Sequence, residues 1–301
     1  MAVYKKTYRP YDGPLTAAGP RLLVIPRYAF DDLRKSRFLA IFFLSTFLYP
    51  LICALLIWLE HNASALRVLG VGAQLSRVIT INATFFLSLL GWQSMLALFL
   101  AAFVGPGRIS PDLSNGGLAL YLARPFSRLE YVVGKMLVLL ILMSLMTWVP
   151  GLLLFGLQGY LEGWSWITAN MRLASAMFFS AWIWILLVCL LALALSAWVK
   201  WKPAAGGLMF GLFFVAAGFG TAIDLVQNTK WGHLMQIFNV VGTVWLYLFE
   251  GNNPTSTGAV FFRVTPGEDL PIWSCCAVLL LLGGMCLYML ARKIRGAEVV
   301  R

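Results

Sequence analysis

Few side chains in this sequence could do covalent or metal chemistry, and they are scattered along the chain. The two histidines, His61 and His233, are far apart, and neither has a second histidine at the spacing of a metal site. The five cysteines all fall within apolar runs, where the adjacent pair Cys275-Cys276 is more typical of packing than of a disulfide or a metal site. The Gly134-Lys135 pair lacks the upstream glycine of a phosphate-binding loop. We therefore expect no enzyme active site, no metal and no cofactor on this chain.

Two polar residues inside apolar runs are the remaining candidates for contact with a substrate, because polar groups are costly in lipid. Gln93 could line an interior pathway, although a hydrogen bond between two helices is an equally good interpretation. Asp224 lies at the end of an apolar run, so we expect it at a membrane interface, solvated or paired with Lys230. Contact with a substrate is the alternative role for Asp224.

The segment 105–135 carries the clearest functional pattern, because it combines basic charge with signals for helix ends. Ser110 can cap a helix whose next residues are Pro-Asp, and an Asn-Gly-Gly run then ends that helix. Ser127 and Glu130 stand three apart before the next apolar run, which is the spacing of a capping box. An ordered basic loop of this length favours a partner-binding surface. A plain connector is the alternative, although such connectors are usually shorter.

These residues are carried on a strongly apolar chain, in which 60% of 301 residues are hydrophobic and 12% are charged. In soluble proteins about a quarter of the residues are charged. A helix needs about 20 apolar residues to cross the hydrocarbon core of a bilayer. Six runs meet that requirement, at roughly 38–59, 81–104, 133–158, 173–198, 205–226 and 271–291. The sequence therefore predicts an all-α, polytopic membrane protein with six transmembrane helices.

The net charge of +11 is explained by membrane orientation rather than by nucleic-acid binding. With both termini in the cytoplasm, 18 of the 23 lysines and arginines fall in cytoplasmic segments and five fall outside. This asymmetry is the one that the positive-inside rule describes. It places residues 105–132 and 199–204 in the cytoplasm and residues 227–270 on the outer side of a bacterial inner membrane.

Two further elements flank the spans. The apolar run 234–249 is too short to cross the bilayer, so residues 227–270 are expected to form a re-entrant or interfacial element before the last span. Residues 26–37 place their apolar and charged side chains on opposite faces, which predicts a helix on the membrane surface. A charged flank that orients the first span is an equally good interpretation. Residues 1–25 are then a cytoplasmic arm, and residues 26–301 are the six-span domain.

Prolines and glycines predict the shapes of three spans. Pro50 should kink the first span, and Pro150-Gly151 should kink the third. The fifth span contains five glycines, which predicts close packing against other helices or a second protomer. These five are Gly206, Gly207, Gly211, Gly218 and Gly220.

The chain resembles the type-two ABC transporter permeases. The resemblance covers most of the chain, but its specific motifs lie in one loop: Ile-Ser-Pro-Asp at 109–112, Leu-Tyr-Leu-Ala-Arg-Pro-Phe-Ser-Arg-Leu-Glu-Tyr at 120–131, and Gly-Lys at 134–135. It is most similar to the bacterial branch that includes the permease of the nitrous-oxide-reductase maturation system. The family often has an acidic residue before this loop, where Gly105-Pro106-Gly107 stands here.

This resemblance implies a transporter subunit with a separate ATPase that binds ATP and Mg²⁺. The loop would contain the coupling helix, which docks on that ATPase, and two permeases would assemble with two ATPases to export or move an unknown substrate. The residues expected to contact the ATPase are Arg108, Asp112, Leu118, Leu120, Tyr121, Arg124 and Arg128. The alternative function is a structural or mechanotransmitting subunit that transports nothing, with residues 227–270 contacting an extracytoplasmic partner.

Overall fold

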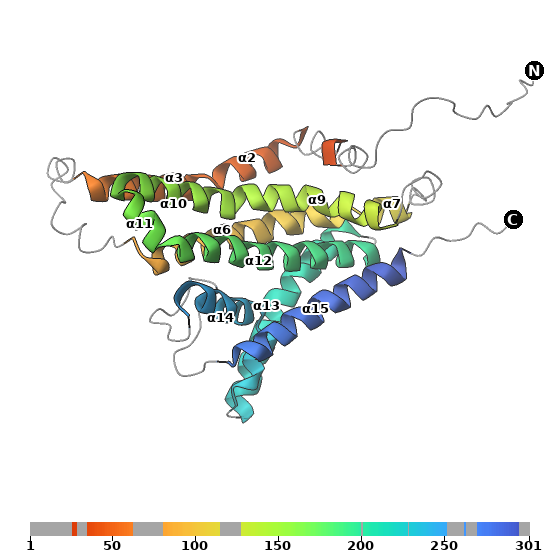
Figure 1. Ribbon diagram of the computed structural model, residues 1–301. Coiled ribbons are helices and arrows are strands. Elements are labelled where there is room, and N and C mark those ends of the chain that lie inside the picture. Colours follow the sequence, from red (N-terminus) through yellow and green to blue (C-terminus); the bar gives the residue numbers. More distant parts are fainter. Residues whose placement is uncertain are drawn as a thin grey trace, which may run out of the picture.

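The computed structural model describes residues 26–28, 35–62, 81–114, 128–199, 201–227, 229–251, 262 and 270–294 (Figure 1). Within these residues every regular element is a helix, which confirms the all-α fold class. The arm 1–25, residues 29–34 of the expected surface helix and loop residues 115–127 lie outside the described residues. The elements are α2 (Arg37–Ser45), α3 (Leu48–His61), α6 (Ala83–Val104), η1 (Gly105–Gly107), α7 (Ser110–Ser114), α9 (Arg128–Met146), α10 (Trp148–Glu162), α11 (Trp164–Ala169), α12 (Met171–Trp198), α13 (Lys202–Gln227), η2 (Trp231–Met235), α14 (Ile237–Glu250) and α15 (Ile272–Lys293).

Six stretches of the described residues are long and apolar enough to cross a bilayer, which confirms the predicted number of spans. They are Arg37–His61, Ala83–Asp112, Glu130–Glu162, Met171–Trp198, Lys202–Gln227 and Ile272–Lys293, and each contains one of the six predicted runs or most of it. We name the two ends of the bundle by their short helices. At the α7 end α9 begins and α12 ends, and at the α11 end α10 ends and α12 begins (Figure 1).

The first and third spans, for which the sequence predicts kinks at Pro50 and Pro150, are each interrupted a few residues before the proline. α2 ends at Ser45 and α3 begins at Leu48, before Pro50. α9 ends at Met146 and α10 begins at Trp148, before Pro150. Proline has no N–H to donate to the carbonyl four residues earlier, and its ring crowds that carbonyl, so the helix is interrupted there.

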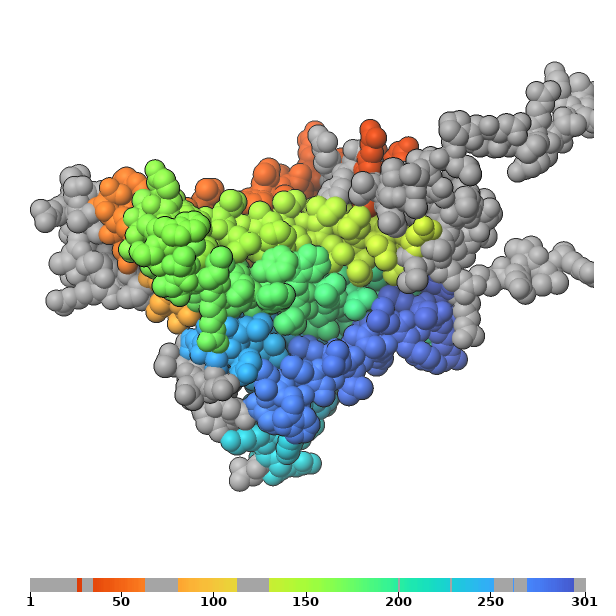
Figure 2. All heavy atoms as spheres, viewed as in Figure 1, coloured from red at the N-terminus to blue at the C-terminus, as the bar shows by residue number. Residues whose placement is uncertain are grey.

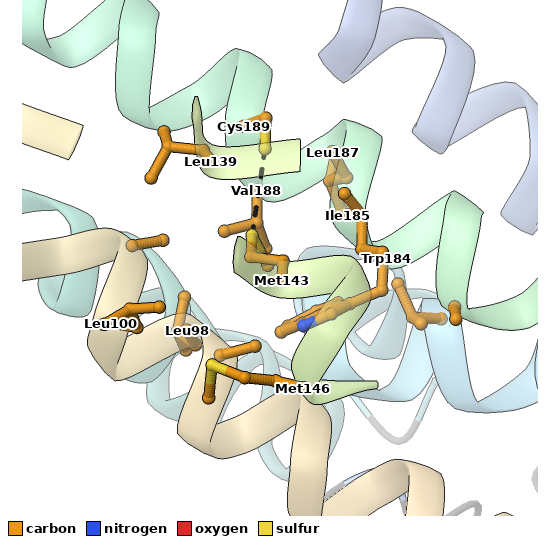
Figure 3. Packing of buried hydrophobic residues seen from close by; sticks show 14 of the residues in the cluster. Leu98, Leu100, Leu139, Met143, Met146, Trp184, Ile185, Leu187, Val188 and Cys189 are labelled. Carbon is orange, nitrogen blue, oxygen red and sulfur yellow. Dashed lines mark hydrogen bonds between the residues drawn. The ribbon is translucent and has the colours of Figure 1, made fainter. Parts of the chain in front are cut away.

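The core lies where α6, α9 and α12 meet (Figure 3). Leu98 of α6, Met143 of α9 and Val188 of α12 are all fully buried. The fully buried Trp184 donates from its indole nitrogen to the carbonyl of Ser94, at 2.9 Å, so α12 is also bonded to α6. Helix α12 is the centre of the bundle, because it contacts α6, α9, α10, α13, α14 and α15.

Helix α14 is too short to cross the bilayer, as the sequence predicted for a re-entrant or interfacial element. Its 14 residues span about 21 Å, short of the ~30 Å core. Near its start, the centroid of the Phe238 ring lies 6.0 Å from the centroid of the Trp184 ring. Trp184 lies on α12, ~20 Å along that helix from the α11 end. Near its end, Arg172, the second residue of α12, donates to the carbonyls of Tyr247 and Leu248. Helix α14 therefore runs from the middle of the bundle to the α11 end.

The surface of the bundle is apolar along three spans. Large side chains are exposed on α2 and α3, on α13 and on α15, among them Ile41, Phe219 and Leu280. Figure 2 shows α15, in blue, along the surface beside α12. Such surfaces are suited to lipid or to another membrane helix.

Candidate functional site

The base of the basic segment is a tight turn where α6 passes through η1 into α7. Gly105-Pro106-Gly107, which stands where the resembling family often has an acidic residue, forms the 3-10 turn η1. A Cβ added at Gly105 would lie 2.7 Å from the Cβ of Ala192, so the glycine permits a close approach to α12. Helix α7 (Ser110–Ser114) starts at the predicted position, with Ser110 as its first residue, and the break predicted at 115–117 lies outside the described residues.

A single buried hydroxyl on α12 makes three hydrogen bonds to the backbone of this turn. The Oγ of Ser196 donates to the carbonyl of Pro106 at 2.8 Å. It accepts from the backbone N–H groups of Ile109 at 3.0 Å and Ser110 at 3.1 Å. A serine hydroxyl has one donor and two lone pairs, so these three bonds use its full capacity. The first N–H groups of a helix have no partner within the helix, and here α12 supplies one for α7.

A carboxylate joins α7 to the start of the next span. Asp112 accepts from the hydroxyl of Tyr131 at 2.7 Å and lies 2.8 Å from the ammonium nitrogen of Lys135. Tyr131 is fully buried, and the side chains of Asp112 and Lys135 are 19% and 13% exposed, so this ion pair is largely shielded from solvent. Charge-assisted hydrogen bonds of this kind are stronger than neutral ones. Asp112 is therefore bonded within the chain, to α9.

The other expected contact residues are only partly described. Arg108 follows η1 and donates from Nε to the carbonyl of Val104 at 3.2 Å, and its side chain is partly exposed. Arg128 is the first residue of α9. Leu118, Leu120, Tyr121 and Arg124 lie outside the described residues, as does Ser127 of the predicted capping box.

Gln93 makes a hydrogen bond between two helical segments, which was one of the two interpretations of this residue; the other was a position lining a pathway. Its Nε2 donates to the carbonyl of Thr46 at 3.0 Å, and the residue is 1% exposed. The carbonyl of Thr46 is the one that would accept from residue 50 in a continuous helix. Because that residue is Pro50, the carbonyl has no helical donor, and Gln93 supplies one. The Gln93 side chain thus joins α6 to the break in the first span.

Asp224, which the sequence predicted to be solvated or paired with Lys230, is partly buried under the turn that follows α13. Its side chain is 11% exposed. Oδ1 accepts from the N–H of Gly232 at 2.7 Å and from the hydroxyl of Thr229 at 3.3 Å, and Oδ2 lies 3.5 Å from Nδ1 of His233. The cause is the return of the chain after α13: η2 packs on α13 so closely that a Cβ on Gly220 would lie against the carbonyl of Gly232.

Sequence reasoning missed two residues of the α7 base, Ser196 and Tyr131. Ser196 is a small polar residue within an apolar run, and the argument that singled out Gln93 applies to it as well. Tyr131 stands in the motif that carried the family resemblance, but nothing in its spacing indicates a bond to Asp112. Both bonds join residues that are 19 to 90 positions apart in the sequence.

Comparison with known proteins agrees with this arrangement of spans. The family described as ABC-2 family transporter protein matches residues 29–291, which include α7, the first five spans and all but the last two residues of the sixth. A comparison with curated proteins finds no match. The finer resemblance to the nitrous-oxide-reductase branch stays a prediction. The chain belongs to the ABC-2 transporter family and is a multi-pass membrane permease.

Proposed function

We propose that this chain couples ATP hydrolysis on a separate ATPase subunit to the export or other movement of a substrate across a bacterial inner membrane. The observation that carries the proposal is the attachment of α7 to two spans, by Ser196 to α12 and by Asp112 to α9. A surface that must transmit a push from a partner has to be rigid and firmly joined to the helices that move. The bonds of residues 105–114 to α9 and α12 support this role, and membership of the ABC-2 transporter family supports the transporter context.

The ATPase contact would consist of the α7 base and the loop that follows it. Arg108, Arg124 and Arg128 supply positive charge for acidic groups on the ATPase, which favours fast and correctly oriented docking. Leu118, Leu120, Tyr121 and Leu122 supply the apolar anchors that carry most of the energy of such contacts. In this assignment the role of Asp112 is to hold α7 against α9, through its bonds to Tyr131 and Lys135.

The α7 end would then face the cytoplasm and the α11 end the outer side. The charge asymmetry of the sequence supports this orientation and places both termini in the cytoplasm. Residues 227–270, including η2 and α14, would lie on the outer side, where they could contact an extracytoplasmic partner.

Hydrolysis would take place on the partner, because the sequence lacks a phosphate-binding loop. The purified single chain should show no vanadate-sensitive ATP hydrolysis, and the complex with its ATPase should show it. The ATPase subunit alone is the control for stimulation by the permease. Vanadate-sensitive hydrolysis by the single chain would contradict the proposal.

A second copy of this chain would pack against one face of α13. At 100° per residue, Gly207, Gly211 and Gly218 fall within about 40° of one another, and a Cβ on any of them would meet nothing within 4 Å. Gly206 and Gly220 point elsewhere and pack within the chain, against the carbonyls of Ala102 and Gly232. Small residues let membrane helices approach closely, so the stripe of three glycines supports a helix–helix contact between copies.

The test of this contact is one bulky substitution with a matched control. Gly211→Leu should reduce the fraction of dimer measured by mass photometry in nanodiscs. Gly283→Leu on α15, where a Cβ also meets nothing within 4 Å, should leave the dimer fraction unchanged. Equal dimer fractions for the wild-type chain and both variants would rule out this face.

A second candidate function is mechanotransmission without transport. The observation that favours it is the burial of Gln93, whose amide is bonded to Thr46 rather than lining an open pathway. ATP-driven movement of material into vesicles containing the complex would support transport. Hydrolysis that alters only an extracytoplasmic partner would support mechanotransmission.

A further inference from the structure

We propose that Ser196 is the positioning residue through which movement of α7 is passed to α12. The inference rests on the proposed function and goes beyond docking, because it assigns the step that follows docking to one side chain. The hydroxyl of Ser196 is fully buried and bonds three backbone groups of the turn between η1 and α7. All three bonds are to backbone groups of the turn, so a displacement of the turn must either move α12 or break these bonds.

Besides the direct continuation of α6 into the turn, the side chains of Asp112 and Ser196 bond the turn to two different helices. Asp112 leads to Tyr131 and Lys135, near the start of α9. Ser196 leads to α12, which packs against spans in every part of the bundle, including α6, α13 and α15. A displacement that enters α12 therefore reaches more of the bundle than one that enters the first turn of α9.

Helix α12 is also bonded to its neighbours along its whole length. Near Ser196, Trp198 donates from Nε1 to the carbonyl of Met289 on α15. In the middle, Trp184 donates to α6, and the carbonyl of Ser180 accepts from Trp245 on α14. At the α11 end, Arg172 donates to the last carbonyls of α14. The α7 turn is thus connected through α12 to the re-entrant helix at the far end of the bundle.

The chain supplies a close control for the loss of this hydroxyl. Ser180 lies on the same helix and is also fully buried, but its Oγ has no hydrogen-bond partner in the described part of the chain. Ser180→Ala and Ser196→Ala remove the same atom from the same helix. Only the second removes bonds to the α7 turn. Ser196→Thr keeps the hydroxyl and tests for rescue.

The experiment uses the complex of the chain with its ATPase in nanodiscs. An environment-sensitive dye on Ser175→Cys, an exposed position near the α11 end of α12, reports movement in a Cys276→Ala background. Adding ATP and vanadate should change the fluorescence of the otherwise unsubstituted complex, of Ser180→Ala and of Ser196→Thr. The change should be lost in Ser196→Ala while the amount of co-purified ATPase stays the same.

Three results would overturn the inference: no fluorescence change in the complex that retains Ser196, an undiminished change in Ser196→Ala, or the same loss in Ser180→Ala. Failure of the ATPase to co-purify with the unsubstituted chain would instead refute the proposed function. A second measurement needs no variant. The amides of Ile109 and Ser110 should stay protected from hydrogen exchange with and without nucleotide, and rapid exchange in either state would overturn the inference.

Discussion

Gln93 and Pro50 do not need to touch in order to be energetically coupled, because both act on the carbonyl of Thr46. Pro50 removes the N–H that this carbonyl would accept in a continuous helix, and Gln93 replaces it with a 3.0 Å bond. Gln93→Leu leaves the buried carbonyl without that donor, which costs ~1–3 kcal/mol in proteins generally. Side-chain hydrogen bonds between membrane helices average only ~0.6 kcal/mol.

An opposing effect reduces the cost of Gln93→Leu further. The Oε1 of Gln93 is buried with no partner among the described residues, so leucine also removes an unsatisfied acceptor. We therefore expect Gln93→Leu to destabilise the chain by about 1 kcal/mol. In a Pro50→Ala background the backbone N–H of residue 50 is restored, and Gln93→Leu should then be neutral or stabilising. The coupling energy between the two positions is thus about 1 kcal/mol.

The assay is reversible unfolding in mixed micelles, with the free energy of unfolding measured for all four combinations. Pro150→Ala provides the matched control, because it restores an N–H at the break in the third span, where Gln93 makes no bond. Gln93→Leu should cost the same in the wild-type and Pro150→Ala backgrounds, and less in Pro50→Ala. Equal costs in all three backgrounds would refute the role assigned to Gln93 and reopen its interpretation as a pathway residue.

Three further predictions follow from the ends of the helices. Asp112→Ala should lower the melting temperature of the chain, because breaking the largely buried ion pair with Lys135 costs roughly 3–5 kcal/mol. The same melting temperature as wild type would contradict the conclusion that Asp112 holds α7 against α9. Arg172→Ala should speed amide exchange in the last turn of α14, measured by mass spectrometry, and unchanged exchange would mean that the arginine does not hold that turn. Cysteines at Ser114 and Thr255, in a background without native cysteines, should label from opposite sides of the membrane, and labelling from one side would contradict the proposed orientation.

Local features of the sequence were enough to predict the architecture. Apolar run length predicts a span because the thickness of the bilayer is fixed, and all six runs were found in this way. Pro50 and Pro150 predict irregular helices because a proline lacks the backbone N–H donor whatever its surroundings, and both spans are interrupted just before them. The run 234–249 was too short to cross, and α14 is indeed too short to do so.

The site depended on information that a single sequence does not contain. Ser196 bonds residues about 90 positions away, and its role follows from the packing of α12 against η1. Asp224 was expected at an interface, solvated or paired with Lys230, and the sequence did not show that η2 returns over α13 and places Gly232 and His233 beside it. For Gln93 the sequence left two interpretations open, and only the position of the first span beside α6 identifies Thr46 as its partner.

The most direct test of the account is whether the segment after α7 holds the ATPase. Leu120→Asp together with Tyr121→Asp would put carboxylates where apolar anchors are expected to enter the partner, and burying an unpaired charge costs several kcal/mol. Arg128→Ala is the comparison, because an exposed ion pair contributes only about 0–1 kcal/mol. The account predicts normal membrane levels of the double variant, loss of its co-purifying ATPase, and a much smaller loss for Arg128→Ala. A double variant that retains its full complement of ATPase would contradict the assignment of this segment as the coupling site.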